Sequence, residues 1–170
     1  MLQLILAALL SAQAAYPEMI PVQETAVVGR AAPGVSLQTL QGEDFSLEAA
    51  RGEVVVFAFW ASWCGPCRRE MPALKQLQAN LTDKPVQIVL INVDKDARDA
   101  RRFLQQIGMT ETDLKVIMDN EARVMGEYGV MSMPTTVLID KNGTVKFSKV
   151  GYSTEKGLAE LETAIAEALR

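Results

Sequence analysis

The sequence of 170 residues contains no histidine and only two cysteines, Cys64 and Cys67. The missing histidine excludes zinc sites with histidine ligands, Ser-His-Asp triads and cysteine nucleophiles activated by histidine. Two cysteines cannot supply the four ligands of a structural zinc site within one chain. Covalent haem attachment is also excluded, because Arg68 follows Cys67 where that motif requires histidine. We therefore expect no metal and no cofactor.

The chain also lacks an excess of basic residues and an apolar segment long enough to span a membrane. Its net charge is −4, whereas a nucleic-acid-binding surface is basic, so we expect no nucleic-acid partner. The apolar run 2–10 is far shorter than the roughly 20 residues of a membrane span, and small residues follow it. This pattern predicts a signal peptide over residues 1–14, cleaved after Ala14. No Lys or Arg precedes the run, so a retained N-terminal membrane anchor is the alternative.

The rest of the chain predicts a linker over residues 15–28 and one folded domain over residues 29–170. Continuous apolar runs at 54–60 and 86–93 indicate buried strands, with 114–118 as a third, short central strand. Further strands are expected at 35–40, 135–139 and 144–150, the last two forming an antiparallel hairpin. Helices are expected from Cys64 or Gly65 to about 81, from a cap at Asp94 or Asp96 to about 107, and at 121–128 and 154–169. This order indicates an α/β fold with a mixed central sheet covered on both faces.

The two cysteines stand in Trp63-Cys64-Gly65-Pro66-Cys67, directly after the strand 54–60. At the start of a helix, free N–H groups and the helix dipole lower the pKa of a thiol and favour a reactive thiolate. We therefore predict that Cys64 is accessible and attacks a disulfide, and that the more buried Cys67 then resolves the mixed disulfide. The alternative is a purely structural disulfide or an incidental pair of cysteines.

Two segments resemble the thioredoxin superfamily. The run 57–67, with Pro72 beyond it, is similar to the thioredoxin active-site segment, and 129–135 is similar to its cis-proline loop. The resemblance covers about residue 29 to the end and implies a thioredoxin-like three-layer fold. It also implies a cis Pro134 with the Met133 backbone beside Cys64, where an extended substrate can pair. The alternative is a trans proline that opens a strand. The implied substrate-binding residues are Trp63, Gly65, Pro66, Met133 and Pro134.

Other features resemble the secreted TlpA/ResA-like group of this superfamily. They are an N-terminal extension after Ala32-Pro33, the pattern Cys67-x-x-Glu70-x-Pro72, and an inserted helix and strand over about 96–118. Cytoplasmic-type thioredoxins carry a buried aspartate where this chain has Ala58, and its lysine partner maps onto Leu90. We therefore hypothesise that Glu70 is partly buried and accepts the proton of Cys67, directly or through water. The alternative is that Glu70 is an ordinary solvated carboxylate on a helix surface.

The resemblance implies a periplasmic or secreted thiol–disulfide oxidoreductase that reduces protein disulfides. The cysteine pair of apocytochrome c is one implied substrate, and a membrane electron donor is the implied source of electrons. Two other functions stay open. One is a disulfide-forming oxidant or isomerase, which Gly65-Pro66 between the cysteines disfavours. The other is a non-catalytic redox-sensing module whose cysteine pair switches a partner interaction.

Overall fold

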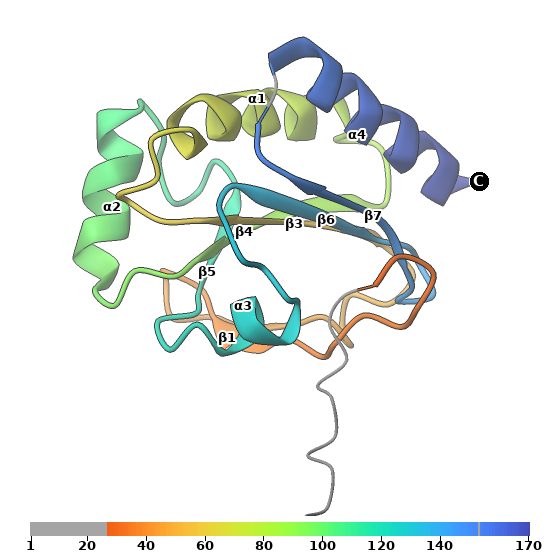
Figure 1. Cartoon of the computed structure of the whole chain (residues 1–170), viewed down its shortest axis with the longest axis horizontal. Helices are drawn as coiled ribbons and strands as arrows, with labels where there is room; N and C mark the ends of the chain where they lie inside the picture. Colours follow the sequence, from red (N-terminus) through yellow and green to blue (C-terminus); the bar gives the residue numbers. More distant parts are fainter. Residues whose placement is uncertain (1–26, 153) are drawn as a thin grey trace, which may run out of the picture.

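The computed structural model of the chain describes residues 27–152 and 154–170 (Figure 1). The predicted signal peptide over 1–14 and most of the predicted linker over 15–28 lie outside these residues. Within them the strands are β1 (Ser36–Gln38), β2 (Asp44–Ser46), β3 (Val54–Trp60), β4 (Val86–Asn92), β5 (Lys115–Met118), β6 (Thr135–Ile139) and β7 (Val145–Val150). The helices are α1 (Cys67–Asn80), α2 (Ala97–Gln106), α3 (Arg123–Glu127) and α4 (Thr154–Leu169). In the part of the chain described, no helix is long and apolar enough to cross a bilayer.

Five strands form the central sheet in the order β5-β4-β3-β6-β7, and β1 pairs with β2 in a separate ribbon. The sheet is mixed, as predicted, because β3 runs parallel to β4 and antiparallel to β6. The antiparallel hairpin of β6 and β7 is also confirmed. The prediction of a central strand at 114–118 is wrong, because β5 lies at an edge. Since β3 already occupies one side of β4, α2 returns the chain to the other, free side.

The side chains of β3 alternate between two cores, because successive residues of a strand point to opposite faces of the sheet. Val56, Ala58 and Trp60 pack with α1 and α4, whereas Phe57 and Phe59 pack with the β1–β2 ribbon and α3. Figure 1 shows α1 and α4 on one face of the sheet, with α3 and β1 on the other. The predicted three-layer arrangement is therefore confirmed, and the fully buried β3 leads directly to the cysteines.

The predicted start of the first helix is wrong, because α1 begins at Cys67 and Pro66 occupies its cap position. Pro66 has no N–H to donate and its ring fixes φ, which suits the end of a turn that enters a helix. Before it, the amide of Cys64 donates to the carbonyl of Ala61 at 3.0 Å, which closes a turn. Cys64 therefore lies in the loop that leads to α1, and only Cys67 lies within the helix.

Candidate active site

Cys64 and Cys67 form a disulfide, with an S–S distance of 2.01 Å. The backbone amide of Cys67, the first residue of α1, donates to Sγ of Cys64 at 3.3 Å. The sulfur of Cys64 therefore faces the helix N-terminus although the residue itself precedes the helix. On reduction, the same amide can donate to the Cys64 thiolate, and hydrogen bonding to a charged form stabilises that form. This geometry satisfies the electrostatic requirement of an attacking thiol.

Exposure differs between the two cysteines. Cys67 is fully buried at 0% exposed, as predicted, and Cys64 is 5% exposed. The expectation of an accessible Cys64 is therefore only partly met, because little of the residue reaches solvent in the disulfide form. The neighbouring Trp63 is 71% exposed, and Gly65 and Pro66 are exposed as well. The residues on either side of Cys64 in the sequence are therefore open to solvent, although Cys64 itself is nearly covered.

Glu70 is buried more deeply than predicted, with only 5% of the residue exposed. It follows Cys67 by three residues on α1, so both side chains lie on the same helix face, and both are buried there. Burial raises the pKa of the Glu70 carboxyl to about 7, against a hydrogen bond from Thr136 that lowers it. A carboxyl with such a pKa exchanges protons near neutral pH, which is the property required of a general acid or base. The alternative of a solvated surface carboxylate is therefore wrong.

Thr136 on β6 is a site residue that sequence reasoning did not identify. Its hydroxyl donates to Oε1 of Glu70 at 3.0 Å, while Oε2 of Glu70 is buried without a hydrogen-bond partner. In the sheet, Thr136 lies directly beside Ala58 of β3. The small side chain of Ala58 stands where cytoplasmic-type thioredoxins carry a buried aspartate. In this chain the buried carboxyl therefore belongs to Glu70 of α1, and the hydroxyl of Thr136 on β6 donates a hydrogen bond to it.

The loop before β6 has the backbone conformation implied by the resemblance. The Met133–Pro134 peptide bond is cis, so the alternative of a trans proline is wrong. The carbonyl of Pro134 accepts from the amide of Gly151 at 2.7 Å, which ties the loop to the end of β7. Met133 is half-buried and packs against the core cluster that contains both cysteines. Met131 of the same loop is 92% exposed, so the loop also presents an apolar side chain to solvent.

Trp60 and Arg68 both pack against Phe103 of α2. Trp60 is fully buried, as predicted, and its ring lies 5.2 Å from that of Phe103. The Arg68 guanidinium lies 4.8 Å from the centre of the same Phe103 ring, a cation–π contact. Although Arg68 is exposed, its head group is thus anchored to α2. This contact holds the inserted helix against the start of α1.

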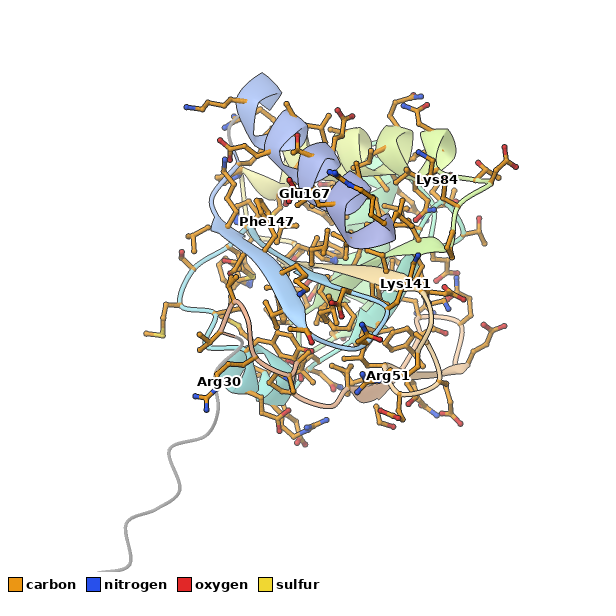
Figure 2. The ribbon with its side chains drawn as sticks, turned by 90° about the vertical axis from the view of Figure 1, so that its right-hand side faces the viewer. Arg30, Arg51, Lys84, Lys141, Phe147 and Glu167 are labelled. Atoms are coloured by element: carbon orange, nitrogen blue, oxygen red, sulfur yellow. A yellow bond between two sulfur atoms is a disulfide. The ribbon has the colours of Figure 1, made fainter. Side chains whose placement is uncertain are left out.

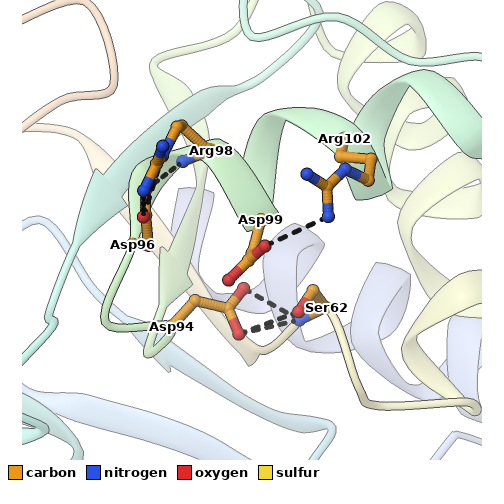
Figure 3. A network of polar contacts seen from close by, with 6 residues as sticks. All are labelled: Ser62, Asp94, Asp96, Arg98, Asp99 and Arg102. Atoms are coloured by element: carbon orange, nitrogen blue, oxygen red, sulfur yellow. Dashed lines mark hydrogen bonds and ion pairs between the residues drawn. The ribbon is translucent and has the colours of Figure 1, made fainter.

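Asp94 anchors the loop that carries Cys64, a role that sequence reasoning also missed (Figure 3). Its carboxylate accepts from the Ser62 amide at 2.9 Å, the Ser62 hydroxyl at 3.0 Å and the Asn92 side chain at 2.9 Å. The helix cap was expected at Asp94 or Asp96, and Asp96 provides it by accepting from the Arg98 amide. Asp94 is free to bind Ser62 because the ends of the parallel strands β3 and β4 lie side by side. Its position two residues beyond the end of β4 was the available signal.

Replacing Asp94 with alanine is expected to lower the free energy of unfolding by about 2–4 kcal/mol, because buried donors lose their acceptor. Asp94 is 5% exposed, so water cannot fully replace its carboxylate. The matched control is Asp96→Ala, which removes an exposed helix cap and is expected to cost about 1 kcal/mol. Urea unfolding of the oxidised proteins measures both. Equal losses for the two variants would contradict the anchoring role of Asp94.

Comparisons with known proteins agree with this geometry. The sequence profile of the Redoxin family matches residues 27–165. Thioredoxin-like protein YneN of Bacillus subtilis (strain 168) is 37% identical over 135 residues, which are 78% of this chain and 76% of the relative. Thiol-disulfide oxidoreductase ResA of Geobacillus thermodenitrificans (strain NG80-2) is 36% identical over 139 residues, which are 81% of this chain and 78% of the relative.

A solved structure is similar over nearly the whole described domain. It is the crystal structure of a protein from Chlorobium tepidum assigned as thiol:disulfide interchange protein DsbE. Its sequence is 37% identical, its TM-score is 0.78, and the match covers 86% of this chain and all of that one. The profile match and these relatives agree with the disulfide of Cys64 and Cys67 at the start of α1. The chain therefore belongs to the Redoxin family of the thioredoxin superfamily, in its TlpA/ResA-like group, and is a thiol–disulfide oxidoreductase.

Proposed function

We propose that this oxidoreductase reduces protein disulfides outside the cytoplasm, using Cys64 as nucleophile, Cys67 as resolving cysteine and Glu70 as proton acceptor. One observation carries the proposal: the disulfide joins Cys64, which directly follows the exposed Trp63, to Cys67, which stands one helical turn before the buried Glu70 on α1. The exposed side allows a protein substrate to approach Cys64. The buried side supplies a base to Cys67, whose thiol is withdrawn from water.

The catalytic cycle begins with both cysteines reduced. The Cys64 thiolate attacks one sulfur of the substrate disulfide, forming a mixed disulfide and releasing a substrate thiolate, which takes a proton from solvent. The Glu70 carboxylate then accepts the proton of the Cys67 thiol. The Cys67 thiolate attacks Sγ of Cys64, which forms the Cys64–Cys67 disulfide and releases the second substrate thiolate. The substrate gains two electrons and the protein loses two.

The exposed apolar side chains next to Cys64 and in the cis-proline loop support a protein as the substrate. Trp63 and Met131 are strongly exposed, and large exposed apolar side chains are typical of sites that bind other macromolecules. We propose that Trp63, Gly65, Pro66, Met133 and Pro134 contact the substrate. An extended substrate segment would lie along the backbone at Met133, beside the cis-proline, and pair with it as an added strand.

The location and the partners complete the proposal. The apolar run 2–10 followed by small residues supports export by a signal peptide over 1–14, with 15–28 as a linker and 29–170 as the domain. An exported reductant requires electrons from the membrane, so we propose a membrane electron donor. The name of the ResA relative supports thiol–disulfide exchange. We propose the cysteine pair of apocytochrome c as one substrate.

The test is a covalent trap in the native host. Cys67→Ser leaves Cys64 able to attack but removes the resolving thiol, so substrates are expected to stay bound through a mixed disulfide. The double variant Cys64→Ser, Cys67→Ser provides the control, because it cannot form that bond. Captured proteins, released by reductant and identified by mass spectrometry, should be exported proteins with paired cysteines. Capture of cytoplasmic proteins only, or of nothing beyond the control, would contradict the proposal.

A further inference from the structure

A small cavity lies on the inner side of Glu70, between α1, β6, β7 and α4. Its volume is about 20 Å³, and a cavity of at least about 10–15 Å³ can hold a water molecule. Its walls are largely apolar, with Phe147 from β7 and Leu158 and Leu161 from α4. Figure 2 shows Phe147 beside α4, where the last strand and the last helix meet. We refer to this space as the β7–α4 cavity.

Two residues that line the β7–α4 cavity are polar and deeply buried. Glu70 and its hydrogen-bond partner Thr136 both line it. Oε1 of Glu70 accepts from Thr136, but Oε2 has no partner among the described residues and is buried. A buried acceptor without a partner costs about 1–3 kcal/mol. A water molecule in the adjoining cavity can remove that cost by donating to Oε2.

The lining of the cavity also includes a residue that contacts solvent. Lys149 of β7 lines it and forms an ion pair with Glu160 of α4. The side chains of this pair are 26% and 41% exposed, and Leu158 beside them is half-buried. The cavity therefore joins a buried carboxyl to the surface. Neither cysteine of the disulfide lines it.

A proton that Glu70 takes from Cys67 has to reach solvent before the next cycle. Cys67 is fully buried and Glu70 nearly so, so neither group can exchange freely with bulk water. We propose that the β7–α4 cavity holds water that solvates the Glu70 carboxyl and passes its proton to solvent beside Lys149. This inference rests on the role of Glu70 in the proposed function. In the step itself, protonated Glu70 gives its proton to the cavity water, which gives one to bulk water, and Glu70 is again a carboxylate.

Changing the size of Leu158 tests this proposal in two directions. Leu158→Phe fills the cavity and is expected to raise the pKa of Glu70 by about one pH unit, because removing water penalises the charged form. Leu158→Ala opens the cavity and is expected to lower that pKa. Carbon NMR of the Glu70 carboxyl in the oxidised full chain measures both. A general loss of stability would not shift the pKa in opposite directions.

Leu169 provides the matched control. It is also a half-buried leucine on α4 that packs against the same core, but it does not line the cavity. Leu169→Phe and Leu169→Ala are expected to leave the Glu70 pKa as in the wild type. In addition, magnetisation transfer from water to the Thr136 methyl group should appear in the wild type and disappear in Leu158→Phe. A dry cavity, or a Glu70 pKa unchanged in both Leu158 variants, would overturn the proposal.

A kinetic measurement separates this proposal from the role of Glu70. When the reduced protein meets a chromogenic aromatic disulfide, Cys64 releases the first coloured thiolate and Cys67 the second. Leu158→Phe is expected to slow only the second release, about tenfold below pH 7, in proportion to the raised pKa. The double variant Glu70→Gln, Leu158→Phe is expected to release the second thiolate no more slowly than Glu70→Gln alone. If Glu70→Gln alone leaves the second release unchanged, the role of Glu70 fails. If Glu70→Gln slows it but Leu158→Phe does not, only the water route fails.

Discussion

Glu70→Gln is expected to raise the free energy of unfolding of the oxidised protein above that of the wild type at high pH. This difference between variant and wild type should be about 3 kcal/mol larger at pH 8 than at pH 4. The reason is that Glu70 has a pKa of about 7 in the folded protein, raised from the ordinary 4.5 by burial. Below pH 4.5 the carboxyl is protonated in both the folded and the unfolded chain. Between 4.5 and 7 only the unfolded chain loses the proton, so the wild type becomes less stable as pH rises. Above 7 the loss is complete, and glutamine avoids it because it carries no charge.

The stability prediction is measured by urea unfolding of oxidised wild type and variant from pH 4 to pH 8. Glutamine has nearly the size and shape of glutamate and keeps the oxygen that accepts from Thr136, so the difference between the two curves reports the charge. Glu162→Gln on α4 is a suitable control, because Glu162 is exposed. It is expected to follow the wild type throughout. Parallel curves for Glu70→Gln and the wild type would show that Glu70 titrates as an ordinary carboxyl.

The same variant also reports on the mechanism. If the Glu70 carboxylate accepts the proton of Cys67, the wild-type rate of resolution rises with pH and levels off above about 7. In Glu70→Gln this rise is expected to disappear, and resolution should be at least about a hundredfold slower at pH 8. The first attack by Cys64 should be almost unchanged. Identical pH–rate profiles would remove Glu70 from the mechanism.

Much of the sheet could be predicted from the sequence because its strands are strongly patterned. The apolar run of β3 and the hairpin turn between β6 and β7 are local signals, and both elements are found where they were expected. The edge position of β5 could not be predicted from its sequence, because Val116 and Ile117 are as apolar as a central strand. They are buried because β4, the rest of the core and the N-terminal segment around Thr39 pack against them.

The candidate site was predictable in its cysteines and less so in the residues that support them. Cys64, Cys67 and Glu70 lie within seven positions of one another, so a local motif finds them. Thr136 and Asp94 reach the site only through strand register, beside Ala58 and after Asn92 respectively. A hydroxyl within a strand has no local signature, and the only local signal for Asp94 was its place just beyond the end of β4. The start of α1 was predicted too early. The helix dipole indicates where a thiolate is favoured, which is the position of the Cys64 sulfur, but it does not define the first helical residue. Pro66 occupies the cap position, so the helix begins at Cys67.

Replacing Cys64 with serine is expected to lower the rate of disulfide reduction by more than about a thousandfold, because a hydroxyl at neutral pH is a far weaker nucleophile than a thiolate. Reduction of insulin by the variant, with a chemical reductant as the electron source, measures the loss. Cys67→Ser should also lose turnover, but for another reason. It can still attack once, because Cys64 keeps its position at the amide of residue 67.

The first attack therefore distinguishes the two cysteines. With the chromogenic disulfide, Cys67→Ser should release one coloured thiolate at a rate within a few fold of the wild type, and then stop. Cys64→Ser should release it slowly, because Cys67 is fully buried. The asymmetry follows from position alone, since the two residues are chemically identical. Fast release by Cys64→Ser and slow release by Cys67→Ser would reverse the assignment, and the surface around Trp63 would then no longer mark the point of attack.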